Sequence, residues 1–212
     1  MMPILVLLRH GESEWNRQNR FTGWVDVDLS PRGVEEARQA GMLLRELPIE
    51  LIFTSTLRRA WRTAEIVREV LGRPDIPIER SSALNERHYG ELQGLNKDEV
   101  RRRYGEEQFR LWRRSYEVAP PGGESLADTQ RRVVPYYRQR IVPELQQGKN
   151  VLIVAHGNSL RALLMELEHI PPEQIPQVEI PTGVPHVYEL EPTTLQVVRR
   201  RIMAPETERA RS

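Results

Sequence analysis

The sequence predicts an α/β fold: a three-layer α/β/α sandwich around a mostly parallel central sheet. Apolar runs at residues 4–8 and 151–155 are unbroken, as in strands that helices cover on both faces. Strand-like and helix-like segments alternate between and around these runs, which is typical of a single α/β sandwich. Because 212 residues suffice for one large domain and no long linker divides them, we expect residues 1–212 to form one domain.

The composition is that of an ordinary globular protein. Hydrophobic residues make up 39% and charged residues 29%, and the formal net charge is +1, so no overall field attracts nucleic acid or an anionic membrane. Cysteine is absent, which excludes disulfides, thiolate metal sites and cysteine nucleophiles and fits a cytoplasmic location. The run at 4–8 is too short for a signal core or a membrane span, so neither is expected.

Local signals predict the elements of the first half of the chain. Ser30-Pro31 indicates a helix start, because serine caps a helix and proline suits its first turn. Gly72 and Pro74 indicate a helix end. The expected elements are a strand at 4–8, a polar loop at 13–29, a helix from 31 that ends before Pro48, a strand at 51–53, a helix over 57–71 and a short strand at 76–79.

Similar signals predict the second half. Asn96 with Glu99 resembles a capping box, and Pro135 inside a helical pattern predicts a kink. The expected elements are a loop at 84–94, a helix from 97 to about 104, a second helical piece around 109–114, a break at 120–123, a helix over 126–141, a strand at 151–155, a helix over 160–167 and an edge hairpin of 187–190 with 195–202. We expect the polar tail after about residue 203 to be mobile.

The two buried strands end in similar residues. Arg9-His10-Gly11-Glu12 follows the first, and His156-Gly157-Asn158-Ser159 follows the second. Ligands of open α/β sheets bind outside the carboxyl ends of the strands, so we expect His10 and His156 to share a site. For either strand alone, a histidine that only satisfies local backbone groups explains the pattern equally well.

The residue types at this edge favour phosphoryl chemistry. His10 is a candidate nucleophile, base or metal ligand, but the other histidines lack ligand-like spacing, which disfavours a metal. Neutral imidazole attacks phosphorus, and the forked donors of Arg9 and Arg59 match phosphate oxygens. A His156 protonated beside an incoming phosphate would add positive charge. Such a site stabilises a transferring phosphoryl group without magnesium.

Two further features each have two interpretations. Phosphoryl transfer needs a proton for the leaving oxygen, and Glu86 is the candidate general acid and base. A surface carboxylate paired with Arg87 explains Glu86 equally well. The pair Arg113-Arg114 is either a solvated helix face or a clamp on a second anionic group of the substrate.

The motifs around these residues resemble the histidine phosphatase superfamily and, within it, the 2,3-bisphosphoglycerate-dependent phosphoglycerate mutases. The resemblance extends from Leu5 to Leu190. It is carried by RHGESEWN at 9–16, NRFTGW at 19–24, LNERHYG at 84–90, LQGLNK at 92–97, WRR at 112–114, AHGNSLR at 155–161 and IPTGVP at 180–185. Many members carry an insertion of a few tens of residues where this chain has only PPGGE at 120–124, and no matched site residue lies in that insertion.

The resemblance implies a phosphoglycerate mutase-like fold and the interconversion of 3-phosphoglycerate and 2-phosphoglycerate, a step of glycolysis and gluconeogenesis. It implies a phosphohistidine intermediate, 2,3-bisphosphoglycerate as the priming cofactor and no metal. The implied catalytic residues are His10, Glu86, His156, Arg9 and Arg59. The implied substrate-binding residues are Asn16, Thr22, Gly23, Tyr89, Lys97, Arg113, Arg114, Gly157 and Asn158.

The main alternative is a phosphatase of the same superfamily that hydrolyses a small phosphomonoester. Its catalytic core would be the same, but the blocks Phe21–Trp24 and Trp112–Arg114 together favour the mutase. A regulatory protein without activity is disfavoured, because a competent side chain fills each catalytic position. The expected partners are phosphoglycerates and, as a homo-oligomer, a second copy of the chain in a dimer; neither nucleic acid nor a membrane is expected.

Overall fold

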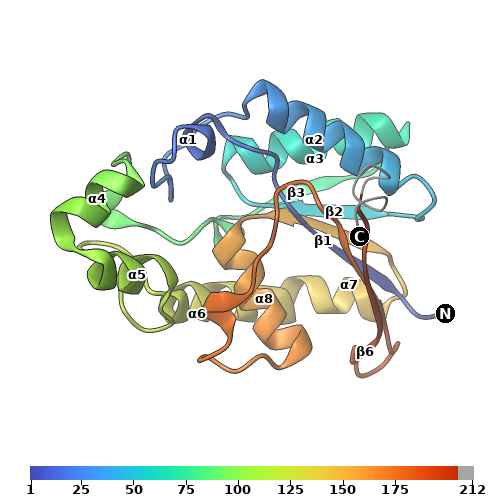
Figure 1. Cartoon of the computed structure of the whole chain (residues 1–212). Coiled ribbons are helices and arrows are strands. Elements are labelled where there is room, and N and C mark those ends of the chain that lie inside the picture. Colours follow the sequence, from blue (N-terminus) through green and yellow to red (C-terminus); the bar gives the residue numbers. More distant parts are fainter. Residues whose placement is uncertain (205–212) are drawn as a thin grey trace.

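A six-stranded sheet with helices on both faces forms the centre of the molecule (Figure 1). The computed structural model describes residues 1–204, so the tail expected to be mobile lies, from residue 205 on, outside the described residues. The strands are β1 (Ile4–Arg9), β2 (Leu51–Thr54), β3 (Ile78–Arg80), β4 (Val151–Ala155), β5 (His186–Leu190) and β6 (Val197–Ile202). Their order is β3-β2-β4-β1-β5-β6, and only the pairings of β5 with β1 and β6 are antiparallel. The predicted α/β class and mostly parallel sheet are confirmed.

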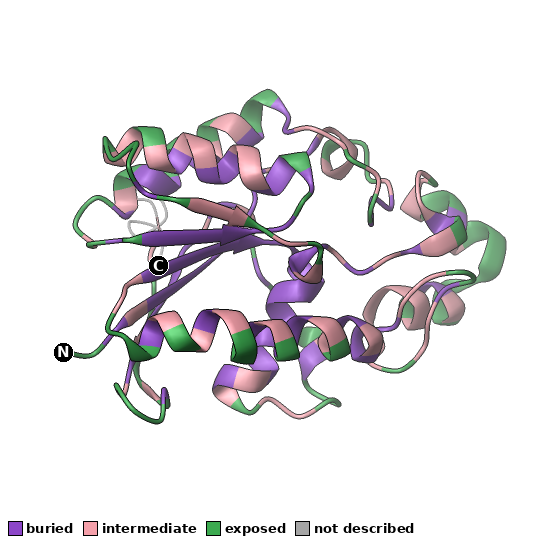
Figure 2. Ribbon diagram, turned by 180° about the vertical axis from the view of Figure 1, so that it is seen from behind, coloured by how far each residue is buried: buried purple, intermediate pink, exposed green. Residues whose placement is uncertain are grey.

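Alternate residues of each central strand pack against opposite helix layers. Leu5 and Leu7 of β1 join the hydrophobic cluster beneath α6 (Leu126–Tyr136), α7 (Val142–Gln146) and α8 (Gly157–Glu168). Val6 and Leu8 join the cluster beneath α2 (Pro31–Leu43) and α3 (Arg58–Leu71). Figure 2 shows the strands buried between these two layers. An unbroken apolar strand is therefore required here, because both of its faces lie in the core.

Three of the helix ends lie where capping signals in the sequence indicated them. The Ser30 hydroxyl accepts a hydrogen bond from the Gly33 N–H at the start of α2, and Gly72 ends α3 with φ of +66°, a left-handed conformation that glycine adopts without strain. The Asn96 side chain caps α4 (Lys97–Tyr104). Local capping chemistry thus fixes where the chain leaves one layer for the next.

Three segments differ in detail from the prediction. The loop over 13–29 contains a one-turn helix, α1 (Glu14–Arg17), because Ser13 and Asn16 cap each other's backbone N–H groups. The loop over 84–94 begins at the end of one 3-10 turn, η1 (Ser82–Leu84), and contains a second, η2 (Gly90–Leu92). The kink expected at Pro135 takes the form of a π-helical turn, η3 (Tyr137–Ile141), which joins α6 to α7. A fourth short turn, η4 (Ile175–Gln177), precedes β5.

A third, smaller cluster lies beyond the carboxyl edge of the sheet, where α4 and α5 (Glu106–Arg114) project from the sandwich (Figure 1). It consists of Phe21, Tyr89, Leu92, Val100 and Phe109, with Trp112 packed against it. This cluster packs the 19–24 loop against α4 and α5, so that these segments face the carboxyl ends of the strands together. Within residues 1–204, no helix is long and apolar enough to cross a membrane.

Candidate active site

The carboxyl ends of β1 and β4 place His10 beside His156, as expected for a shared site. The two strands pair in parallel with Arg9 opposite Ala155, so the residue after each strand reaches the same edge. The ring centroids are 4.9 Å apart, and the residues are only 2% and 0% exposed. Both imidazoles therefore lie in one buried environment at the switch from strand to loop.

The ring of His10 presents one nitrogen that is free to react. Its Nδ1 lies 2.6 Å from the Gly11 carbonyl oxygen, which can only accept, so Nδ1 carries the proton of the neutral ring. The lone pair is then on Nε2. Burial lowers the pKa of His10 well below its usual value, and Arg59 and Arg9 lower it further. A neutral ring with an available Nε2 is competent as a nucleophile or a base.

His156 is held from the neighbouring strand β2. Its Nε2 lies 2.7 Å from the hydroxyl of Ser55, the residue that follows β2. Burial, followed by the charge of Arg59, lowers the pKa of His156 well below its usual value. The positively charged His156 considered in the sequence analysis therefore requires a bound anion to raise that pKa.

Two guanidinium groups flank the histidines. Arg59, in the first turn of α3, is buried and donates to the carbonyls of Gly23 (2.7 Å) and Val25 (3.0 Å). Burial lowers the pKa of Arg59 to about 10, which leaves it charged at neutral pH. Arg9 donates to the Ile180 carbonyl (3.0 Å), and its buried Nε has no hydrogen-bond partner among the described residues.

Glu86 reaches the same edge from the loop after η1. One of its carboxylate oxygens accepts hydrogen bonds from the backbone N–H of Asn158 (3.0 Å) and of Arg87 (2.8 Å). The first of these N–H groups belongs to the N-terminus of α8, a position that favours negative charge. The Arg87 guanidinium donates instead to the carbonyls of Val118 and Glu124, so the ion pair considered as an alternative for Glu86 is not formed.

A polar pocket of about 160 Å³ opens over these groups. The predicted site residues that line it are Arg9, His10, Asn16, Thr22, Gly23, Arg59, Glu86, Tyr89, Lys97, Arg113, Arg114, Gly157 and Asn158. His156 lies behind this lining, against His10. Segments that are far apart in the sequence thus meet in one cavity.

Four pocket residues were not among the predicted site residues: Arg20, Phe21, Arg161 and Glu179. Arg161 lies one helical turn after Gly157 in α8, and its Nη1 donates to the Asn158 side chain at 3.3 Å. That spacing is the signal that would have identified it, because residues four apart share a helix face. The exposed Glu179 lies 3.6 Å from the partly buried Arg114, and both residues also line a second, more open groove.

Three cations of the pocket lining, Lys97, Arg113 and Arg114, come from α4 and α5. Burial, followed by the charge of Arg113, lowers the pKa of Lys97 to about 8. Burial and then Arg114 lower the pKa of Arg113. Cations that are kept close together and away from water favour an anionic ligand between them. Within residues 1–204, no group of three or more His, Asp or Glu side chains is arranged to hold a metal ion.

Comparison with known sequences gives a consistent family. Residues 5–202 match the family model described as "Histidine phosphatase superfamily (branch 1)". The chain is 57% identical to the 2,3-bisphosphoglycerate-dependent phosphoglycerate mutase of Cytophaga hutchinsonii, over 89% of this chain and 88% of that protein. It is 53% identical to the protein of the same name from Beijerinckia indica, over 90% of this chain and 93% of that protein.

Comparison with solved structures finds the same fold, in one case on a protein named as a phosphatase. A mycobacterial glucosyl-3-phosphoglycerate phosphatase solved with VO3 superimposes with a TM-score of 0.80 at 27% identity, covering 96% of this chain and 98% of that chain. The Bacillus stearothermophilus protein YhfR superimposes with a TM-score of 0.80 at 33% identity, covering 92% and 95%.

Proposed function

Because the chain belongs to the histidine phosphatase superfamily, branch 1, we propose that it is a 2,3-bisphosphoglycerate-dependent phosphoglycerate mutase. The observation that carries the proposal is a pocket with two cationic regions, Arg9 with Arg59 beside the histidines and Lys97 with Arg113 and Arg114 from α4 and α5. A substrate with one anionic group at each end fits such a pocket, and a plain phosphomonoester needs only the first region.

The side chains present fit a molecule with two phosphates and a carboxylate. 2,3-Bisphosphoglycerate supplies the phosphoryl group that primes His10. The unpartnered Nε of Arg9 is a buried donor that an anion would satisfy. A Cβ at Gly157 would lie 3.1 Å from Arg161 Nη1 and 3.9 Å from Arg9 Cζ, so the bare backbone leaves these donors room around an anion.

His10 and Glu86 divide the chemistry between nucleophile and proton carrier. Nε2 of His10 attacks phosphorus; the N–P bond forms, the P–O bond breaks, and Glu86 donates its proton to the leaving alkoxide oxygen. In the second half-reaction Glu86 takes the proton of the attacking hydroxyl as the phosphoryl group leaves His10. Arg9, Arg59 and His156 stabilise the charge on the phosphoryl oxygens during both transfers.

The second candidate function is hydrolysis of a phosphomonoester, which the similarity to the mycobacterial glucosyl-3-phosphoglycerate phosphatase supports. Water would then replace the phosphoglycerate hydroxyl as the acceptor from His10. The cations Lys97, Arg113 and Arg114 favour the mutase, because they hold an acceptor that carries its own negative charges in the place that water would use.

The test compares transfer with hydrolysis on 3-phosphoglycerate, with and without 2,3-bisphosphoglycerate. We expect conversion to 2-phosphoglycerate to exceed phosphate release, to require priming, and to leave an acid-labile, base-stable label on His10 when the primer carries labelled phosphorus. The variant His10→Ala should carry no label. Phosphate release as the dominant reaction would support the phosphatase, and a label that survives in His10→Ala would overturn the assignment of the nucleophile.

We extend the proposal to the setting of the reaction. The enzyme works without a metal ion, in the cytoplasm, as a homodimer. Mutase turnover should persist after exhaustive treatment with a chelator, and loss of turnover that added metal restores would refute metal independence. Sedimentation of the purified protein should give twice the 24.7 kDa of one chain.

A further inference from the structure

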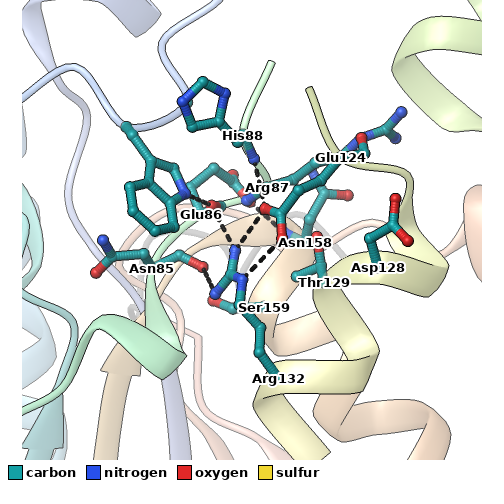
Figure 3. Close-up of polar contacts among 12 residues, drawn as sticks. Asn85, Glu86, Arg87, His88, Glu124, Asp128, Thr129, Arg132, Asn158 and Ser159 are labelled. Carbon is teal, nitrogen blue, oxygen red and sulfur yellow. Dashed lines mark hydrogen bonds and ion pairs between the residues drawn. The ribbon is translucent and has the colours of Figure 1, made fainter. Parts of the chain in front are cut away.

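Arg132 on α6 lies outside the pocket but holds the loop that carries Glu86. Its Nη1 donates to the carbonyls of Ala83 and Asn85, both at 2.9 Å, and its Nη2 donates to the carbonyl of Glu86 itself at 2.8 Å. Figure 3 shows the guanidinium aimed at this backbone. One planar fork thus fixes three carbonyls within four consecutive residues, and Nη1 also donates to the Ser82 carbonyl at a longer 3.4 Å.

Glu124 holds this guanidinium in place. Its two carboxylate oxygens accept from Nε and Nη2 of Arg132 at 2.9 and 2.8 Å, in the two-pronged geometry that gives an arginine–carboxylate pair its directionality (Figure 3). Both side chains are only 21% exposed. The same carboxylate accepts from the backbone N–H of His88 at 2.8 Å, so the pair spans both sides of Glu86 in the sequence.

The Glu86 carbonyl has a second donor, the indole N–H of Trp24, at 2.6 Å. The ring of Trp24 lies with its centroid 5.4 Å from the Arg132 guanidinium carbon, within the range of a cation–π contact. Trp24 belongs to the NRFTGW block that lines the pocket through Thr22 and Gly23. The contact therefore connects the Glu86 loop to the wall of the substrate pocket.

We propose that Arg132, oriented by Glu124, is a positioning residue for Glu86: by fixing the backbone of residues 83–86 it keeps the Glu86 carboxylate where it gives and takes the proton of the phosphoglycerate oxygen. This inference rests on the proposed function. Among residues 1–204 the carboxylate itself accepts only two backbone hydrogen bonds, both at one oxygen. The backbone beneath it must therefore define the position of the other oxygen, and a displacement of about 1 Å in a catalytic group can cost on the order of 100-fold in rate.

A positioning role differs from a purely structural one in its dependence on the leaving group. Phosphorylation of His10 by 2,3-bisphosphoglycerate expels an alkoxide, which needs the proton of Glu86. Phosphorylation by p-nitrophenyl phosphate expels a stable phenolate, which needs little protonation. A misplaced Glu86 should slow the first reaction and spare the second, whereas a general disturbance of the site should slow both.

The experiment measures the single-turnover rate of phosphohistidine formation with each donor at saturation, by rapid quench. The variants are Arg132→Met, which removes the donors, and Arg132→Lys, which keeps the charge but not the fork. The matched control is Arg131→Met on the same helix, because Arg131 is 75% exposed and, within the described part of the chain, pairs only with Asp128. Unfolding temperatures are recorded for all variants.

We expect Arg132→Met to lower the rate with 2,3-bisphosphoglycerate by roughly 10- to 100-fold and the rate with p-nitrophenyl phosphate by less than about 3-fold. Arg132→Lys should show the same selectivity to a smaller extent, which keeps the test valid if the Met variant fails to fold. The control should match the wild type. Equal losses with both donors, or no loss with either, would overturn the positioning role while leaving the proposed function intact. A wild-type protein that forms no phosphohistidine would instead overturn the proposed function.

Discussion

At the scale of single residues, the site needs one basic side chain neutral and others charged. His10 must keep a lone pair on Nε2, whereas Lys97 must carry a proton to attract an anion. The arginines beside His10 serve both needs, because Arg59 and Arg9 add to the effect of burial in lowering the pKa of His10 while they attract the phosphoryl group. The same cationic region therefore binds the reacting group and keeps its nucleophile deprotonated.

Lys97 gives this balance a measurable pH dependence. Burial and Arg113 lower the pKa of Lys97 to about 8, and a bound phosphoglycerate, being anionic, raises it again. Above pH 8 the free protein must take up a proton in order to bind, so affinity falls as pH rises. We expect the Kd of 3-phosphoglycerate to be nearly constant from pH 6.5 to 7.5 and then to weaken by up to about tenfold per pH unit toward pH 9.5.

Calorimetric titration at several pH values measures this dependence, and Lys97→Arg is the control. Arginine keeps its charge through this range, so the variant should bind with a flatter pH profile. The phosphate ester is already a dianion above pH 7 and contributes no slope of its own. An equal slope in both proteins would assign the pH dependence to another group.

At the scale of elements, local patterns predicted what depends on neighbours in the sequence. The ends of β1 and β4, the caps Ser30 and Asn96, and the site of the kink at Pro135 follow from propensity and capping chemistry. The π-helical form of that kink does not, because it depends on how the helix packs after it loses a hydrogen bond.

Contacts between distant segments were outside the reach of those patterns. The hydrogen bonds from Arg132 to backbone carbonyls within residues 83–86 join positions 46 to 49 residues apart. The sequence around an arginine in an amphipathic helix does not indicate such a distant partner. For the same reason, the sequence did not indicate that Glu179 and Arg20 line the pocket. The resemblance located the reacting groups, whereas the support beneath them became visible only in three dimensions.

The segment that follows β1, at Gly11 and Glu12, crosses closely over Gly33 in the first turn of α2. This close approach allows another prediction at the scale of elements. A Cβ at Gly33 would lie 2.0 Å from the Glu12 carbonyl oxygen, and one at Gly11 would lie 2.2 Å from the Gly33 carbonyl oxygen. Gly33→Ala gains about 1 kcal/mol in helix propensity, but a backbone clash of this depth requires the two segments to separate. We expect a net loss of about 1–3 kcal/mol in the free energy of unfolding, measured by urea denaturation.

Function should change with stability in Gly33→Ala, because the Gly11 carbonyl accepts the hydrogen bond from the Nδ1–H of His10. Phosphohistidine formation should be slower even at temperatures where the variant is folded. Arg32→Ala, at the exposed neighbouring position, is the matched control and should behave as the wild type. A Gly33→Ala protein as stable as that control would show that the crossing has more room than the geometry indicates.

At the scale of the whole molecule, three buried imidazoles connect folding to pH. Burial is the main cause that lowers the pKa of His10, His156 and His186. His186 is placed by β5 among the apolar side chains of Leu7, Leu160, Leu164 and Ile180, and neither of its ring nitrogens has a hydrogen-bond partner among the described residues. Arg200 lowers its pKa further, while Glu168 opposes the shift.

The sign of the effect follows from which state binds the proton. In the unfolded chain each histidine takes up a proton as pH falls below about 6.5, whereas the folded protein resists protonation until a lower pH. The stabilising effect of these neutral rings is therefore complete above pH 6.5 and is lost as pH falls through the pKa of the folded state. Each such histidine contributes a slope of up to about 1.4 kcal/mol per pH unit to the free energy of unfolding.

His186→Leu separates this contribution from that of the active site. Leucine fits the apolar surroundings without two unsatisfied nitrogens, so the variant should keep the stability of the wild type at pH 7.5 and exceed it at pH 5.5. Urea denaturation at intervals between these pH values should give a slope smaller by about one proton, while phosphohistidine formation at pH 7.5 stays unchanged because His186 lies outside the pocket lining. An unchanged slope would mean that His186 already takes up its proton in the folded state, and the loss of stability in acid would then belong to the two histidines of the site.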